Sequence, residues 1–359
     1  MIRNIYLKLV FLGIILLSAK CSNSKKNEKC FVIALEGGGD KGAYQAGVLK
    51  GMMSKLEKEK RSYDIVTGIS VGSINAATLI TFEKGQELEA ADYLVTAWKN
   101  IKGNKEIYVE WPYGIAQGIF FKQSIYDASP LKDKLSSTLK DRKISRKFVI
   151  GATKARDGNY ATFTEEDVKT IDDLINVVRS SAAIPVLFPS ILHKGEYYMD
   201  GGVINNVDIF SGINKCLEMG YEEKDITVDI IRCKPNKEVE EVEDISKFNS
   251  FKMLMRYINI STKNLFMNTI ESVLRNFPNV NYRYLIYPVK ELPSSFPPLN
   301  FTEEEVEKMI NIGIEDGENV VTNHGDSGNV RSLYKEFMDS KKSKQKRKPK
   351  NLKSIKFLD

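Results

Sequence analysis

Histidine and cysteine are scarce in this 359-residue sequence, which contains two histidines and four cysteines. The histidines lie far apart, and neither residue type shows the spacing of a zinc ligand set, so we predict no metal site. Internal repeats and the motifs of nucleic-acid-binding folds are also lacking. The apolar and charged fractions, 42% and 28%, are ordinary and instead indicate one globular α/β domain with a sizeable core.

Long apolar runs are confined to the N-terminus. Basic residues precede the run at residues 9–17 and small residues follow it, which is typical of a secretory signal peptide. The run is short for a bilayer span, so a retained membrane anchor is the alternative. Cys21 would suit a lipoprotein, but Lys20 is unlike the small residue that such processing prefers. We expect a signal peptide at residues 1–21, a polar linker at residues 22–29, and secretion or membrane association on the secretory route.

Three cysteines remain once the signal peptide is removed: Cys30, Cys216 and Cys233. An odd number leaves at least one thiol free or paired between chains, although a secretory route makes disulfides possible. Cys216 shares a helical face with Ile209 and Ile213. We therefore predict that Cys216 is a small buried apolar side chain.

A serine lies between two glycines where a strand should meet a helix. The β-branched residues 65–67 predict the end of a buried strand, and residues 71–82 have the spacing of a helix. Gly68 and Gly72 flank Ser70 as G-x-S-x-G, and their missing Cβ atoms let strand and helix approach closely while the serine is strained. At a helix N-terminus the Ser70 hydroxyl would meet a dipole that stabilises developing negative charge, so we predict Ser70 as a nucleophile.

A glycine-rich loop follows the first predicted strand. Residues 30–35 form a continuous apolar run, as in a central parallel strand, and residues 43–56 have helical spacing. Backbone N–H groups in such a loop can bind an anion or a reacting oxygen. The loop consists of Glu36, Gly37, Gly38, Gly39, Asp40, Lys41 and Gly42.

The same loop has a second interpretation as a dinucleotide site, because its glycines also satisfy G-x-G-x-x-G. That fingerprint needs an acidic residue at the end of the second strand. Here the second strand ends in Thr67 and Gly68 and leads directly to Ser70. We therefore favour an oxyanion hole for acyl transfer over a phosphate site, with Lys41 ordering the loop.

Asp200 opens a third motif, Asp200-Gly201-Gly202, directly after a predicted strand. The three motifs, in this order, resemble those of the patatin-like phospholipase family: G-G-G-x-[R/K]-G, G-x-S-x-G and D-G-[G/A]. The resemblance extends from residue 31 to residue 207 and continues faintly at residues 299–302. Asp208 departs from the family, which often has a proline there.

The resemblance implies a three-layer αβα fold with a mainly parallel central sheet and one acyl hydrolase domain at residues 30–338. It implies a Ser70–Asp200 dyad that cleaves phospholipid or related lipid esters through an acyl-enzyme, without a cofactor. The oxyanion hole would use the amides of Gly37, Gly38 and Gly39. The supporting motif residues are Asp40, Lys41, Gly42, Gly68, Gly72, Gly201 and Gly202. A non-catalytic lipid-binding or storage protein on the same fold is the alternative.

The histidines leave a triad open as an alternative to the dyad. His193 and His324 both fall in polar segments and are predicted to be solvated loop residues. An order of serine, aspartate and histidine ending in His324 would match α/β-hydrolases. In the dyad, Asp200 is itself the base, and we expect desolvation in a lipid-covered cleft to raise its pKa.

Two further segments have open interpretations. Residues 107–121 are rich in aromatic side chains, which we expect to be buried, with an aromatic flap that meets lipid as the alternative. Residues 341–359 carry nine Lys or Arg and one Asp. We expect a solvated tail at residues 339–359, and contact with an anionic membrane surface is the functional alternative. A lipid or membrane-surface substrate is the expected partner, and the oligomeric state is left open.

Overall fold

The computed structural model describes residues 28–235, 242, 244–293, 299–323 and 329–346. The predicted signal peptide and most of the predicted linker lie outside the described residues, as do residues 347–359 of the basic tail. None of the helices in the described ranges has the length and apolar character needed to cross a membrane.

Strand β1 (Cys30–Leu35) lies in the middle of the sheet because it is apolar on both faces. Val32 and Ala34 belong to one core cluster, whereas Ile33 and Leu35 belong to a second. A strand that buries both faces needs helices on both sides of the sheet. The sequence pattern therefore determines the layered arrangement.

The main sheet has eight strands in the order β10-β9-β1-β2-β5-β8-β7, and β6 also pairs with β5. Strands β10, β9, β1, β2 and β5 are parallel, and β6, β7 and β8 are antiparallel additions. The remaining strand bounds are β2 (Ile65–Ile69), β5 (Lys147–Lys154), β6 (Tyr160–Phe163), β7 (Ile191–His193), β8 (Glu196–Asp200), β9 (Ile226–Ile231) and β10 (Asn281–Ile286). The predicted mainly parallel sheet is confirmed, and β10 is a strand at its edge.

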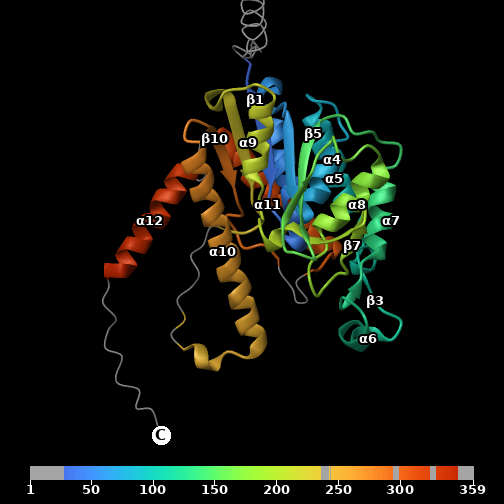
Figure 1. Cartoon of the computed structure of the whole chain (residues 1–359). Helices are drawn as coiled ribbons and strands as arrows, with labels where there is room; N and C mark the ends of the chain where they lie inside the picture. The colour runs from blue at the N-terminus through green and yellow to red at the C-terminus, as the bar shows by residue number, and fades with distance from the viewer. Residues whose placement is uncertain (1–27, 236–241, 243, 294–298, 324–328, 347–359) are drawn as a thin grey trace, which may run out of the picture.

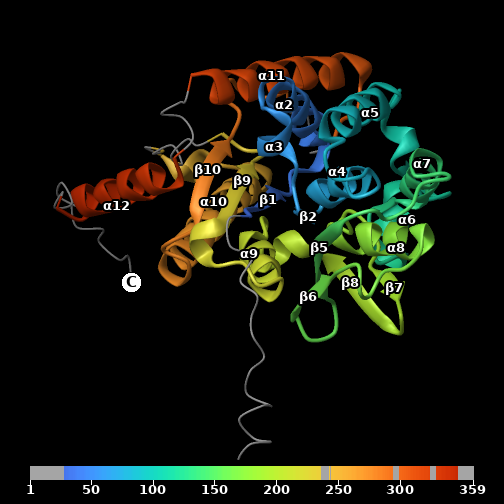
Figure 2. The same cartoon turned by 90° about the horizontal axis from the view of Figure 1, so that it is seen from above.

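Helices cover both faces of this sheet, and Figure 2 shows the three layers from above. The larger core cluster contains side chains from α2 (Gly42–Lys55), α4 (Val71–Leu79), α5 (Glu87–Lys99), α7 (Ser129–Thr138), α8 (Ile171–Ser181) and α11 (Glu303–Thr322). The smaller cluster contains side chains from α9 (Ile209–Glu218), α10 (Ser250–Asn276) and α12 (Val330–Lys346). The predicted three-layer αβα fold is confirmed.

The shorter elements lie in the connections. They are α3 (Lys58–Arg61), α6 (Gly114–Phe121), a two-stranded sheet of β3 (Val109–Glu110) and β4 (Tyr126–Asp127), and the 3-10 turns η1 (Gly39–Lys41), η2 (Asn104–Glu106), η3 (Gly201–Val203), η4 (Glu223–Asp225) and η5 (Ile245–Lys247). Helix α12 runs through Lys346, so the described part of the predicted basic tail continues a helix. Helix α6 was not predicted.

The register of β5 brings two distant parts of the chain together. Gly151 pairs with β2 and β6, and Ala152 pairs with β6 and β8. Since a strand has only two edges, β2 and β8 must share the edge of β5 that β6 leaves free. The two strands run toward each other along that edge and meet end to end, so the residue after Ile69 lies beside Asp200.

A disulfide joins Cys30, the first residue of β1, to Cys216 in α9. The prediction that Cys216 is simply a buried apolar side chain was therefore wrong. Its helical face does pack on the sheet as the pattern indicates, but Cys30 lies at that contact, and sequence spacing does not reveal such a pairing. Cys233 is a free buried thiol, which confirms that one cysteine stays unpaired.

Candidate active site

Ser70 occupies the turn between β2 and α4 with a strained backbone, at φ 53° and ψ −126°. Such a conformation is uncommon outside glycine and persists only where its surroundings enforce it. A Cβ atom on Gly68 would lie 2.5 Å from the Gly72 carbonyl oxygen, so the glycines are needed for the strand and helix to approach. The Ser70 amide donates to Ser181 Oγ at 3.0 Å, and the Ser73 hydroxyl donates to the Ser70 carbonyl at 2.6 Å. The expected strained turn is confirmed.

Asp200 ends β8 beside Ser70, close enough for the Ser70 hydroxyl to lower the pKa of the Asp200 carboxyl group. The Gly202 amide donates to Asp200 Oδ1 at 2.7 Å, which fixes the orientation of the carboxyl group. Both Ser70 and Asp200 are buried. Burial raises the pKa of Asp200 to about 6, and the nearby Ser70 hydroxyl and Gly202 amide oppose that rise. The carboxylate is therefore ionised at neutral pH, yet basic enough to accept a proton from the serine.

The three glycines predicted for the oxyanion hole differ in their partners. The Gly37 amide donates to the Asn206 carbonyl at 2.9 Å, and Asn206 Nδ2 donates back to the Gly37 carbonyl at 3.0 Å. Among the described residues, no hydrogen-bond acceptor is paired with the amide of Gly38 or Gly39. These two amides are therefore free to donate to a ligand, whereas the Gly37 amide helps to fix the loop.

Residues around the glycine loop hold its shape. Asp40 is buried and accepts hydrogen bonds from Lys41 Nζ at 2.9 Å and from the Asn300 amide at 3.1 Å. A Cβ atom on Gly38 would clash with Cys233, and one on Gly42 would clash with Trp98. The loop is therefore clamped from three distant parts of the chain.

A buried carboxylate lies beneath the loop, and sequence reasoning did not single it out. Glu36 accepts a hydrogen bond from the Cys233 amide at 2.8 Å and pairs with Arg232 Nε at 3.4 Å. The Arg232 guanidinium lies over the Phe266 ring, 3.6 Å from its centre. The sequence signal that could have pointed to Glu36 is its position directly before the glycines. Asn206 and Cys233 offered no comparable motif.

His193 contradicts its prediction as a solvated loop residue. It ends β7, is 5% exposed, and its ring lies edge-on to Phe163 with the ring centres 5.7 Å apart. Burial lowers the pKa of His193. Its Nε2 atom has no hydrogen-bond partner among the described residues, so neither Ser70 nor Asp200 bonds to that nitrogen. The prediction failed because an edge strand beside aromatic rings buries a residue that its polar neighbours suggested was exposed. His324 lies outside the described residues.

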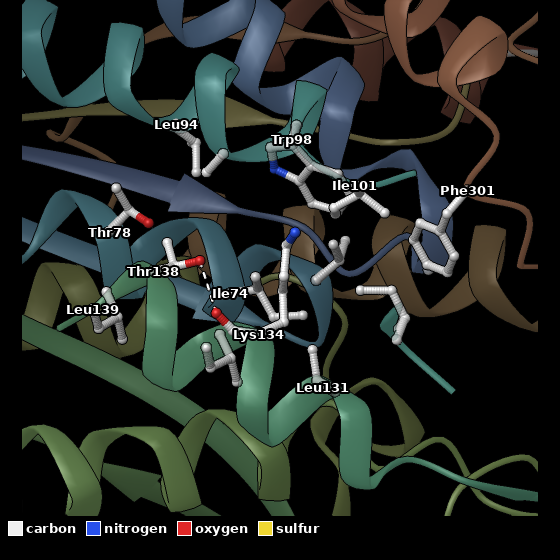
Figure 3. Close-up of a pocket in the computed structure, with 15 residues that line it drawn as sticks. Ile74, Thr78, Leu94, Trp98, Ile101, Leu131, Lys134, Thr138, Leu139 and Phe301 are labelled. Atoms are coloured by element: carbon white, nitrogen blue, oxygen red, sulfur yellow. Dashed lines mark hydrogen bonds between the residues drawn. The ribbon is translucent and has the colours of Figure 1, made fainter. Parts of the chain in front are cut away.

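Figure 3 shows an apolar cavity of about 60 Å³ near the site. Gly39 and Val71, the neighbours of Gly38 and Ser70, line one part of it. The other lining side chains come mainly from α4, α5 and α7, and those labelled in Figure 3 include Ile74, Leu94, Trp98, Leu131 and Phe301. Lys134 is the only charged lining residue, and its ammonium group donates to Glu106 at 2.6 Å. The cavity therefore suits an apolar group of a ligand.

Nothing in the described residues forms a group of three or more His, Cys, Asp or Glu side chains that could hold a metal ion. The reactive groups that this site brings together are therefore a hydroxyl, a carboxylate and backbone amides. That set fits acyl transfer by nucleophilic attack.

The sequence profile of the patatin-like phospholipase family matches residues 33–212, half of the chain. The chain belongs to the patatin-like phospholipase family. The matched range contains the glycine loop, the Ser70 turn and the Asp200 motif, and the family resemblance is confirmed. Asp208, where the family often has proline, caps α9 by accepting from the Ser211 amide at 3.0 Å.

Two individual proteins are similar to this family member. "Probable lipid hydrolase 463L" of Invertebrate iridescent virus 6 is 25% identical over 187 residues, which are 49% of this chain. The match spans 61% of the viral protein, so the similarity covers about three fifths of that relative. The crystal structure of VipD from Legionella pneumophila is 14% identical, with a TM-score of 0.38, and the comparison covers 83% of this chain and 67% of VipD.

Proposed function

We propose that this patatin-like protein is a serine lipid acyl hydrolase of the phospholipase A or lysophospholipase type. It would cleave acyl esters of phospholipids or related lipids through an acyl-enzyme. The observation that carries the proposal is the placement of Ser70, in a strained turn, between the buried Asp200 carboxylate and the glycine loop, where two backbone amides have no partner among the described residues. The family, and a viral relative described as a lipid hydrolase, also support a lipid-hydrolysing enzyme.

Asp200 acts as the base in the proposed reaction. Its carboxylate takes the hydroxyl proton as Ser70 Oγ attacks the acyl carbonyl, and the oxyanion that forms accepts hydrogen bonds from the Gly38 and Gly39 amides. The N-terminus of α4 adds a favourable dipole. The protonated Asp200 then gives its proton to the leaving alcohol. Deacylation follows in the same way, with water as the nucleophile and Asp200 again as the base.

The apolar cavity would receive the acyl chain. It begins at Gly39 and Val71, so a chain entering it would leave its carbonyl near Ser70 and the loop amides. Each buried methylene contributes about 0.8 kcal/mol, which favours an aliphatic substrate over a polar one. A lipid ester is therefore the substrate class that this cavity supports best.

A serine-directed fluorophosphonate tests the proposed chemistry. We expect one adduct per chain, which peptide mapping assigns to Ser70. Ser70→Ala should abolish labelling, while Ser180→Ala, which changes a buried helical serine whose hydroxyl donates to the Asn176 carbonyl, should keep it. A folded protein that gives no adduct, or an adduct elsewhere, would favour the lipid-binding or storage alternative.

We also propose that the protein is secreted. The disulfide between Cys30 and Cys216 supports an oxidising compartment, because structural disulfides are rare in the cytosol. N-terminal sequencing of the mature protein tests this proposal. We expect it to begin near residue 22, and a chain that still begins at Met1 would contradict it.

A further inference from the structure

We propose that the protein docks on an anionic lipid bilayer through two apolar projections. We call them the α6 projection, residues 111–122, and the α10 projection, residues 245–260. This inference rests on the proposed function, since it identifies the surface from which the same site would take its lipid. More than half of the exposed large apolar side chains of the described residues lie in these two segments.

The α6 projection presents its largest side chains to solvent. Phe120 is 75% exposed and Phe121 is 81% exposed, and Tyr113, Ile115 and Ile119 are exposed beside them. A soluble surface rarely gathers so many large apolar side chains, and such a patch marks an interaction site. Aromatic side chains are favoured at the boundary between water and lipid. The expectation that the aromatic residues at positions 107–121 are buried is therefore wrong for this helix, although Tyr108 is buried.

The exposure of the α6 projection is built into the fold. Trp111 Nε1 donates to the Ser124 carbonyl at 3.0 Å, and Lys122 lies over the Trp111 ring. A Cβ atom on Gly118 would clash with the Ile125 backbone, so the helix packs directly on the returning chain. Strands β3 and β4 close the base of the projection. Its scaffold thus turns Phe120 and Phe121 outward.

The α10 projection combines apolar side chains with positive charge. Tyr257 is 65% exposed and Leu254 is 52% exposed, and Ile245, Met253, Ile258 and Ile260 are also exposed. Residues 245–260 contain three Lys or Arg and no Asp or Glu, and one of the three, Lys247, pairs with Asp244 just before the projection. A helix that displays both apolar and basic side chains binds anionic membrane surfaces. This charge complementarity favours an anionic bilayer as the occupant.

The second half of α10 packs in the core of the fold. Phe266, Ile270 and Val273 are buried in the smaller core cluster, whereas most described residues from 252 to 261 are exposed. A helix of 27 residues is about 40 Å long, so its first half reaches well beyond the sheet. The exposed apolar side chains therefore stand clear of the body of the protein.

Both projections extend on the side where the site opens. In Figure 1 the chain enters β1 at the top, so the carboxyl ends of the parallel strands, where Ser70 lies, face downward. Helix α6 and the beginning of α10 extend below the sheet on either side of that edge. Ile107 lines the apolar cavity, and Tyr108 packs on Tyr126 and Phe188 just before β3. Buried apolar side chains thus lie between the base of the α6 projection and the cavity.

Vesicle sedimentation with the full chain tests the docking surface. The Ser70→Ala background prevents turnover, and vesicles of phosphatidylcholine alone are compared with vesicles that also contain phosphatidylserine. Phe120→Ser with Phe121→Ser should weaken binding to the anionic vesicles by roughly tenfold or more. Leu254→Ser should also weaken binding, whereas Leu192→Ser, at a similarly exposed leucine (56%) on β7, should not. Equal losses for the two leucine variants would overturn the proposal.

Charge is tested with a matched pair of double variants. Lys247→Gln with Lys252→Gln should weaken binding only to the anionic vesicles, and less at high salt. Lys58→Gln with Lys60→Gln is the control, because α3 precedes β2 at the opposite end of the sheet. Lys247 and Lys60 each pair with an acidic residue three positions earlier, so both double variants remove one such pair. If the first double variant binds anionic vesicles as well as the wild type does, the proposal that the surface docks on an anionic bilayer is wrong.

Hydrolysis of a soluble short-chain ester separates the two proposals. With Ser70 restored, the projection variants should hydrolyse this ester at the wild-type rate and phospholipid vesicles more slowly. A parallel loss on the soluble ester would overturn docking as the role of the projections. Vesicle binding that depends on the projections in a wild-type protein without esterase activity would support docking and refute the proposed function.

Discussion

Asp200 must be ionised to act as a base, although its burial favours the neutral form. Its pKa of about 6 lies above the value of an exposed aspartate, so folding takes up a proton between these two values. The contribution of Asp200 to stability is therefore full below about pH 4 and is lost as pH rises through about 6.

Asp200→Asn should consequently stabilise the protein at alkaline pH while abolishing hydrolysis. We expect the gain in the free energy of unfolding to be about 2–3 kcal/mol larger at pH 8 than at pH 4, because the asparagine cannot ionise. Denaturant unfolding at both pH values measures it. A gain that does not change with pH would mean that burial does not raise the pKa of Asp200.

The pH dependence of hydrolysis should follow the same group. We expect kcat/KM for a soluble ester to rise with pH through an inflection near 6, as Asp200 loses its proton. His193→Ala should keep both the inflection and most of the activity, because no hydrogen bond links its Nε2 atom to the site. Collapse of activity in a folded His193→Ala variant would replace the dyad by a triad.

The Gly38 amide offers a test of the oxyanion hole. Gly38→Ala should lower kcat by about 10²–10³, because its Cβ atom would displace the loop from Cys233 and misplace the amide. Gly103→Ala is the control, since no atom lies within 4 Å of the added Cβ. Normal turnover by folded Gly38→Ala would assign the loop another role.

Residue-level prediction succeeded where a motif fixed the backbone. The glycines around Ser70 predict its strained turn because only Gly68 and Gly72 permit that approach. Asn206 and Cys233 were missed, since each acts through a contact with the glycine loop that sequence separation hides. His193 was misjudged because its burial depends on Phe163, a partner thirty residues away.

At the scale of elements, the disulfide fastens α9 to the first strand. Cys30 and Cys216 are separated by 186 positions, so the bond closes a long loop in the unfolded chain. Replacing both cysteines by serine should lower the free energy of unfolding by about 2–5 kcal/mol. Wild-type protein under reducing conditions should lose a similar amount. Equal stability with and without reductant would show that this bond is absent in solution.

Elements with a clear pattern were predicted within a few residues, and irregular ones were not. The apolar run of β1 follows from burial on both faces of the strand, and α2 is buried along almost all of its length, where Gly47 and Gly51 pack on α11. Helix α6 escaped prediction because Gly114 and Gly118 argue against a helix. Tertiary contacts stabilise this helix instead, since Gly118 packs directly on the Ile125 backbone.

At the scale of the whole molecule, the basic C-terminus should add to membrane attraction. Residues 347–359 contain five of the nine basic residues after position 340. Their deletion should weaken binding to anionic vesicles at low salt and leave hydrolysis of a soluble ester unchanged. Each basic residue that reaches the surface contributes about 1 kcal/mol. Equal binding with and without these residues at low salt would show that they do not contact the membrane.

The end-to-end meeting of β2 and β8 means that the register of β5 sets the spacing of the proposed dyad. Ile69 pairs with Gly151 and Asp200 pairs with Ala152, so two adjacent residues of β5 set the distance between Ser70 and Asp200. The chain segments that connect β2, β5 and β8 do not affect this distance. Chimeras that exchange the residues between α4 and β5 with those of a relative should therefore keep the nucleophile and base in place while changing the acyl cavity and the α6 projection. Such chimeras should acquire the substrate preference of the relative while Ser70 and Asp200 keep their positions.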